Sequence, residues 1–173
     1  MNENSSNRGT VEAIWLKPQH KRPMTPVGSA VLVTNRGIRG NANQNGRRQV
    51  TVITRERWRE VEQRLGRPID PALRRANLMV SGIELAGTRG QLLRVGSALI
   101  EIWGETRPCK LMDESMPGLQ DALRDNWGGG VFGVILEGGE VRVGDAVELF
   151  AGPAPALPAA FPRGRRPDQL DLI

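Results

Sequence analysis

Residues 91–110 read QLLRVGSALIEIWGETRPCK, and this stretch indicates both a class of fold and a chemically active position. Its two apolar runs, residues 91–95 and 98–104, have the length of β-strands. Gly96 lies between them, and glycine, which has no Cβ, takes the positive φ that a tight bend requires. The stretch therefore predicts two strands joined by a bend, followed by a loop that carries Cys109.

The same pattern of short apolar runs between turn signals recurs along the chain. It predicts further strands at residues 11–17, 30–34, 49–54, 78–81, 132–137 and 145–150. Many short strands with few helices are typical of a mainly β protein, and we expect a β-barrel with two or three peripheral helices.

Two helices and one short turn are predicted between these strands. Thr54 is a suitable N-cap for a helix over residues 55–65, which carries apolar side chains on one face. A second helix is expected over residues 117–127, because proline favours the first turn of a helix. Residues 70–73 combine a capping aspartate with a proline and predict a single helical turn.

Composition divides the chain of 173 residues into three parts. Residues 1–9 are polar, and we expect a flexible N-terminus. Residues 10–150 hold all the predicted strands and helices and form the folded domain. Residues 151–173 contain five of the twelve prolines and are expected to be a disordered tail.

Basic residues are concentrated in one part of the sequence. Residues 36–75 hold eleven arginines against four carboxylates, in a chain whose net charge is +5. Arginine binds phosphate and carboxylate groups through a rigid fork of donors. The stretch therefore predicts an anionic ligand, which is either a phosphorylated small molecule or nucleic acid. Nucleic acid is the less favoured of the two, because the few aromatic residues do not alternate with the basic ones.

Several other classes of site are excluded by residue counts. A single cysteine allows no intrachain disulfide and no cysteine-cluster metal site. His20 is the only histidine, so no zinc site is expected, and no flavin motif or pyridoxal phosphate lysine is present. No signal peptide or membrane-spanning run is recognised, and we expect a cytoplasmic protein.

Cys109 is the strongest candidate for a reactive residue. Arg107 and Lys110 flank it, and positive charge near a thiol favours the thiolate. A thiolate binds soft metals and attacks sulfur. The alternative is an inert buried cysteine that behaves as a small apolar side chain.

Two polar segments are candidates for binding an anionic ligand. The loop at residues 37–50 is rich in glycine and asparagine and contains Asn43, Arg48 and Gln49. Its alternative interpretation is a solvated connection between strands. In the second segment, one arginine of the pair Arg74-Arg75 can reach an anion while the other turns outward, and Asn77 follows.

The order of these motifs resembles the MOSC family, the domain found at the C-terminus of molybdenum cofactor sulfurases. The motifs are Gly40 with Asn43, Arg48-Gln49-Val50, Arg75-Ala76-Asn77-Leu78 with Gly82, Gly90 with Leu93 and Gly96, Arg107-Pro108-Cys109, Pro117-Gly118-Leu119, and Gly139 with Val143-Gly144-Asp145. The resemblance covers residues 10–150 and implies a β-barrel whose key cysteine is matched by Cys109.

The resemblance also implies a function. Cys109 would coordinate the molybdenum of a bound molybdopterin cofactor in a reductase of N-hydroxylated compounds, with a separate redox partner as electron donor. Alternatively, Cys109 would carry sulfur as a persulfide received from a cysteine desulfurase. The positions that match cofactor contacts are Arg48, Gln49, Arg75 and Asn77, to which we add Asn43 and Arg107.

One departure from the family pattern concerns the glycine-rich loop. Many members have Gly-Asp there, often followed by histidine, whereas this chain has Asn41 and Asn43. Neutral amides replace the acid and the imidazole, which argues against a proton-transfer role for this loop. A non-enzymatic binder of anions or nucleic acid remains the third hypothesis.

Overall fold

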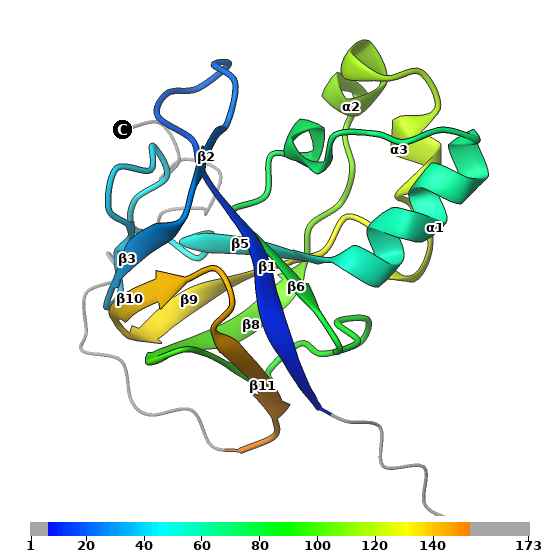
Figure 1. Ribbon diagram of the computed structural model, residues 1–173. Coiled ribbons are helices and arrows are strands. Elements are labelled where there is room, and N and C mark those ends of the chain that lie inside the picture. Colours follow the sequence, from blue (N-terminus) through cyan, green and yellow to red (C-terminus); the bar gives the residue numbers. More distant parts are fainter. Residues whose placement is uncertain (1–6, 153–173) are drawn as a thin grey trace, which may run out of the picture.

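The computed structural model describes residues 7–152, and its centre is a closed β-barrel (Figure 1). The strands follow one another around the barrel in the order β11-β7-β8-β9-β5-β6-β1, and β1 pairs again with β11. Their bounds are β1 Arg8–Leu16, β5 Val50–Thr54, β6 Leu78–Ser81, β7 Leu92–Val95, β8 Ala98–Glu105, β9 Val131–Glu137 and β11 Ala146–Phe150. All pairs are antiparallel except β5 and β6. The predicted mainly β barrel is confirmed.

The barrel closes where the two ends of the described chain meet. Arg8 lies opposite Glu148 and Thr10 opposite Ala146 in the β1–β11 pair. Strand structure therefore begins at Arg8, two residues before the expected start of the folded domain, because these residues complete the ring. The tail predicted for residues 151–173 falls almost entirely outside the described residues.

A smaller sheet, β10-β3-β4, packs on the barrel. It consists of β3 Ser29–Val33, β4 Gly37–Ile38 and β10 Gly139–Arg142, and the short strand β2 Thr25–Val27 pairs with β1. Leu32 and Val141 belong to the same buried core as the barrel interior. The strands β2, β4 and β10 were not predicted, since they are short and rich in glycine, proline or charge.

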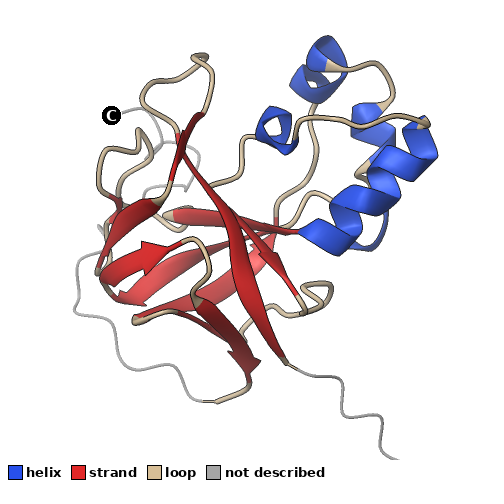
Figure 2. Ribbon diagram, viewed as in Figure 1, coloured by secondary structure: helices blue, strands red, loops and turns tan. Residues whose placement is uncertain are grey.

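The helices lie together on one side of the barrel (Figure 2). They are α1 Arg55–Leu65, η1 Pro71–Arg74, α2 Lys110–Ser115, α3 Leu119–Ala122 and η2 Asp125–Trp127. Helix α1 has the predicted bounds, because Thr54 Oγ1 accepts a hydrogen bond from the Arg57 amide at 3.3 Å and Gly66 ends the helix with φ 74°. No helix in residues 7–152 has the length and apolar character needed to span a membrane.

The helical prediction for residues 117–127 was wrong in its extent. Only Leu119–Ala122 forms an α-helix, and Asn126 and Trp127 both have positive φ. Helix α2 was not predicted, and it begins directly after Cys109. A second apolar core joins α3 to α1 and α2 to η1, so the helix that follows Cys109 packs against the turn that ends at Arg74.

Candidate functional site around Cys109

Cys109 lies where the chain leaves the barrel and enters the helical layer. β8 ends at Glu105, and the Thr106 amide then donates to the Gly130 carbonyl at 2.8 Å, which holds the exit segment against the start of β9. Cys109 occupies the N-cap position of α2 in an extended conformation, with φ −122° and ψ 172°. Its side chain is exposed and forms no disulfide.

Arg74 is the cation that the fold buries near this cysteine. Its side chain comes from the end of η1, and the residue is only 6% exposed. Nε donates to the Gly129 carbonyl at 2.9 Å, and Nη2 donates to the Thr106 carbonyl at 3.4 Å. Within residues 7–152, the guanidinium has no carboxylate partner.

The pKa of Arg74 reports this environment. The pKa is lowered to about 10, chiefly because burial removes water from the guanidinium and, to a smaller extent, because Arg48 is positively charged. Cys109 acts in the opposite direction, because its thiolate favours the charged guanidinium. The three side chains are thus close enough to interact electrostatically. The two arginines carry two positive charges, and a single thiolate neutralises only one of them.

Glycine makes this burial possible. A Cβ on Gly129 would lie 2.2 Å from the Thr106 carbonyl oxygen and 3.3 Å from Arg74 Nη2. Because Gly129 has no side chain, the segment just before β9 can lie close to the Thr106 carbonyl and the Arg74 guanidinium. Thr106 Oγ1 is buried and has no hydrogen-bond partner among the described residues. An arginine without a carboxylate and a hydroxyl without a partner both suit an anionic ligand.

Arg75 is directed elsewhere. It adopts the left-handed conformation at φ 61°, and its Nη1 donates to the Arg22 carbonyl at 2.6 Å. Partial burial lowers its pKa. The sequence analysis indicated that one arginine of the pair Arg74-Arg75 reaches an anion, but it placed Arg75 rather than Arg74 among the cofactor contacts, and it did not single out Thr106.

Gln49 is part of the barrel and does not face this site. It is 1% exposed, and its Nε2 donates to Asn35 Oδ1 at 3.1 Å and to the Gly46 carbonyl at 2.9 Å. Its Oε1 accepts from the Ile135 amide at 3.0 Å. Both amide hydrogens are used within the protein, so we do not retain Gln49 as a ligand contact.

Asn77 likewise connects elements of the fold. Its Nδ2 donates to the Trp15 carbonyl at 3.2 Å and to Asn41 Oδ1 at 3.1 Å, and its Oδ1 accepts from Thr51. Asn41 Oδ1 also accepts from the Lys17 amide at 2.7 Å. This network fixes the asparagine-rich loop to β1 and β6.

Asn43 and Arg107 differ strongly in exposure. Asn43 is 7% exposed, and its Oδ1 accepts from Lys17 Nζ at 3.4 Å. The Arg107 side chain is 88% exposed, and its Nε lies 3.9 Å from a Glu105 carboxylate oxygen. Arg107 thus offers a solvated positive charge two residues from the thiol.

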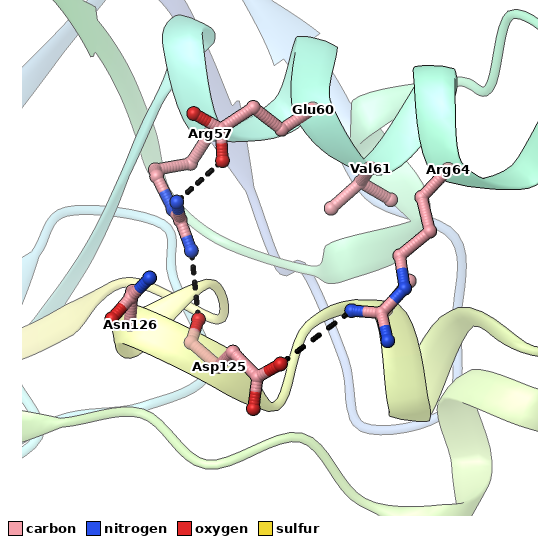
Figure 3. A pocket seen from close by; sticks show the side chains of 7 residues that line it. Arg57, Glu60, Val61, Arg64, Asp125 and Asn126 are labelled. Carbon is pink, nitrogen blue, oxygen red and sulfur yellow. Dashed lines mark hydrogen bonds and ion pairs between the residues drawn. The ribbon is translucent and has the colours of Figure 1, made fainter.

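A separate cavity of about 190 Å³ lies within the helical layer between α1 and η2 (Figure 3). Most of its polar groups contact one another: Arg57 pairs with Glu60 and donates to the Asp125 carbonyl at 2.8 Å, and Arg64 lies 3.7 Å from the Asp125 carboxylate. Arg57 Nε is buried without a partner among the described residues. The cavity does not include Cys109, and we assign it a structural role in joining the two helices.

Comparison with known proteins agrees with this fold. The sequence profile of the MOSC domain matches residues 29–148. No curated protein matched the chain. YuaD from Bacillus subtilis is similar in structure, with a TM-score of 0.70 and 19% identity over 84% of this chain and 97% of that one.

Two further solved structures are YiiM proteins. YiiM from Geobacillus stearothermophilus has a TM-score of 0.65 and 22% identity over 82% of this chain and 75% of that one. YiiM from Escherichia coli has a TM-score of 0.63 and 17% identity over 86% of this chain and 73% of that one. At these sequence identities the solved structures support the fold alone. The match to the family profile covers most of the sequence and shows that the chain belongs to the MOSC domain family.

Proposed function

We propose that the protein binds the molybdenum cofactor, with the Cys109 thiolate as the ligand of the metal. The supporting observation is the buried Arg74, which lacks a carboxylate partner within residues 7–152 and lies within electrostatic reach of an exposed thiol. A thiolate suits molybdenum, and a guanidinium suits the phosphate of a pterin. The residues present therefore fit the group that the family implies.

The chain's own residues have separate tasks in this proposal. Cys109 would hold the metal, Arg74 and Arg48 would hold the phosphate, and Thr106 would donate a further hydrogen bond. When bound, the cofactor would supply the redox chemistry for the reduction of N-hydroxylated compounds, with electrons from a separate partner protein. Asn41 has no titratable group at the position where many members carry an acid, so a proton must reach the substrate by another route.

Metal analysis tests the proposal. Protein purified from a host that makes the cofactor should contain molybdenum and a pterin, and Cys109→Ser should lose the metal. Arg74→Met should reduce the pterin content, whereas Arg75→Met, a change at the neighbouring position, should not. Wild-type protein without molybdenum, or a Cys109→Ser variant that retains it, would contradict the proposal.

Sulfur transfer is the second candidate, and the exposure of Cys109 favours it, since a carrier thiol must reach another protein. The Cys109 thiolate would attack the outer sulfur of a desulfurase persulfide. A new S–S bond forms on Cys109, and the desulfurase thiolate leaves. Mass spectrometry after incubation with a cysteine desulfurase and cysteine should show one added sulfur atom on Cys109, and an unmodified thiol would argue against this role.

A further inference from the structure

A groove on the outer face of the barrel, which we call the Trp103 groove, has no role in the function proposed above. Its volume is about 370 Å³, and its lining includes Trp103, Phe132, Arg47, Arg89 and Glu101. This volume is at the lower end of the range of small-molecule sites, about 300–1,000 Å³. The lining combines aromatic rings with two guanidinium groups and one carboxylate.

The two aromatic rings carry guanidinium groups on their faces. The Arg47 Cζ lies 4.5 Å from the centre of the Trp103 ring, and the Arg48 Cζ lies 5.2 Å from the centre of the Phe132 ring. At these distances the cation is attracted to the ring face. Arg48 is also the residue whose charge acts on Arg74, so the groove adjoins the Cys109 site through Arg48.

Gly104 provides the space in which Arg89 lies. A Cβ at this position would be 3.2 Å from Arg89 Nη2 and 3.4 Å from Phe132 Cε1. These distances are tighter than ordinary van der Waals contacts. Because Gly104 has no side chain, the Arg89 guanidinium can lie against β8 at this position.

Polar groups of the groove lack protein partners. Trp103 Nε1 is buried and donates to nothing within the described residues. In the same part of the chain, Arg47, Arg89 and Glu101 form no ion pair. The three charged side chains therefore have no ion-pair partner within residues 7–152 to give up when a ligand binds.

We propose that the Trp103 groove binds a nucleoside monophosphate, either free or as the terminal group of a larger ligand. The phosphate lies between Arg47 and Arg89. The planar base stacks on the Arg47 guanidinium, which itself lies over the Trp103 ring. Glu101 accepts from the base N–H groups, which a bare phosphate lacks, and the groove is therefore poorly suited to a simple anion.

Isothermal titration calorimetry with GMP tests this proposal. Wild-type protein should bind GMP, and Arg89→Ala should weaken binding by about 10- to 100-fold, the usual effect of losing a charge-assisted hydrogen bond. Trp103→Ala removes the ring on which the Arg47 guanidinium lies, and it should weaken binding by about tenfold. Arg142→Ala, a change at an exposed arginine paired with Glu140, is the matched control and should bind as wild type.

Cys109→Ser separates this inference from the proposed function. It should lose molybdenum yet bind GMP unchanged, and loss of GMP binding in this variant would show that the nucleotide occupies the cysteine site instead. Absence of GMP binding, equal binding of inorganic phosphate, tight binding of a single-stranded oligonucleotide without GMP binding, or equal weakening by Arg142→Ala would each overturn the proposal.

Discussion

Replacing Arg74 with methionine should make the stability of the protein depend differently on pH. The fall of the Arg74 pKa to about 10 corresponds to a cost of about 3 kcal/mol for the buried charge, at about 1.4 kcal/mol for each pKa unit. Arg74→Met removes this cost but leaves the Gly129 and Thr106 carbonyls without a donor, at about 1 kcal/mol each. Near neutral pH the two effects nearly cancel, and the free energy of unfolding should change by less than about 2 kcal/mol.

The sign of the pH dependence follows from proton binding. The folded-state pKa of Arg74 is lower than its ordinary value, so above about pH 10 the unfolded chain binds more protons than the folded one. Wild-type stability should then rise relative to Arg74→Met by up to about 1.4 kcal/mol per pH unit. Urea unfolding at several values between about pH 8 and pH 11 measures this difference.

The neighbouring residue supplies the control. Arg75 is only partly buried, so the difference in stability between wild type and Arg75→Met should change less with pH over the same range. A constant difference between wild type and Arg74→Met from about pH 8 to pH 11 would refute the reasoning, because it would mean that the guanidinium is not destabilised by burial.

Three further changes test the packing around the site by thermal or urea unfolding. Gly129→Ala places a Cβ 2.2 Å from the Thr106 carbonyl oxygen and should destabilise the fold by about 3 kcal/mol or more, and wild-type stability would show that the segment shifts freely. Gln49→Met removes three buried hydrogen bonds and should cost about 3 kcal/mol, whereas a change under about 1 kcal/mol would argue against its structural role. Thr54→Ala removes the cap of α1 and should cost about 1 kcal/mol, and no loss would mean that water replaces the cap.

The fold was predictable where local signals and tertiary structure agree. Helix α1 has the predicted bounds, since its cap and its terminating glycine are both encoded locally. β10 was missed because its sequence, Gly-Glu-Val-Arg, buries only Val141, and the strand is stabilised by its pairing with β3. Such pairing depends on residues more than a hundred positions away, which no local pattern contains.

The site was predictable only in part for a similar reason. Cys109 was chosen from its residue type and the flanking charges, and the structure places it exposed at the N-cap of α2. The choice between Arg74 and Arg75 depends on the left-handed backbone at Arg75, which turns the two side chains apart. Residue type does not distinguish the two arginines, and the composition of the segment gives no indication of the φ angle at the end of η1.

The pairing of β1 with β11 has a consequence for how the protein behaves in concentrated solution. A ring of strands leaves no long row of unpaired amides and carbonyls for another molecule to extend. If residues 8–10 were removed, the edge of β11 would become available to a second copy of the chain. These three residues therefore protect the molecule against edge-to-edge aggregation.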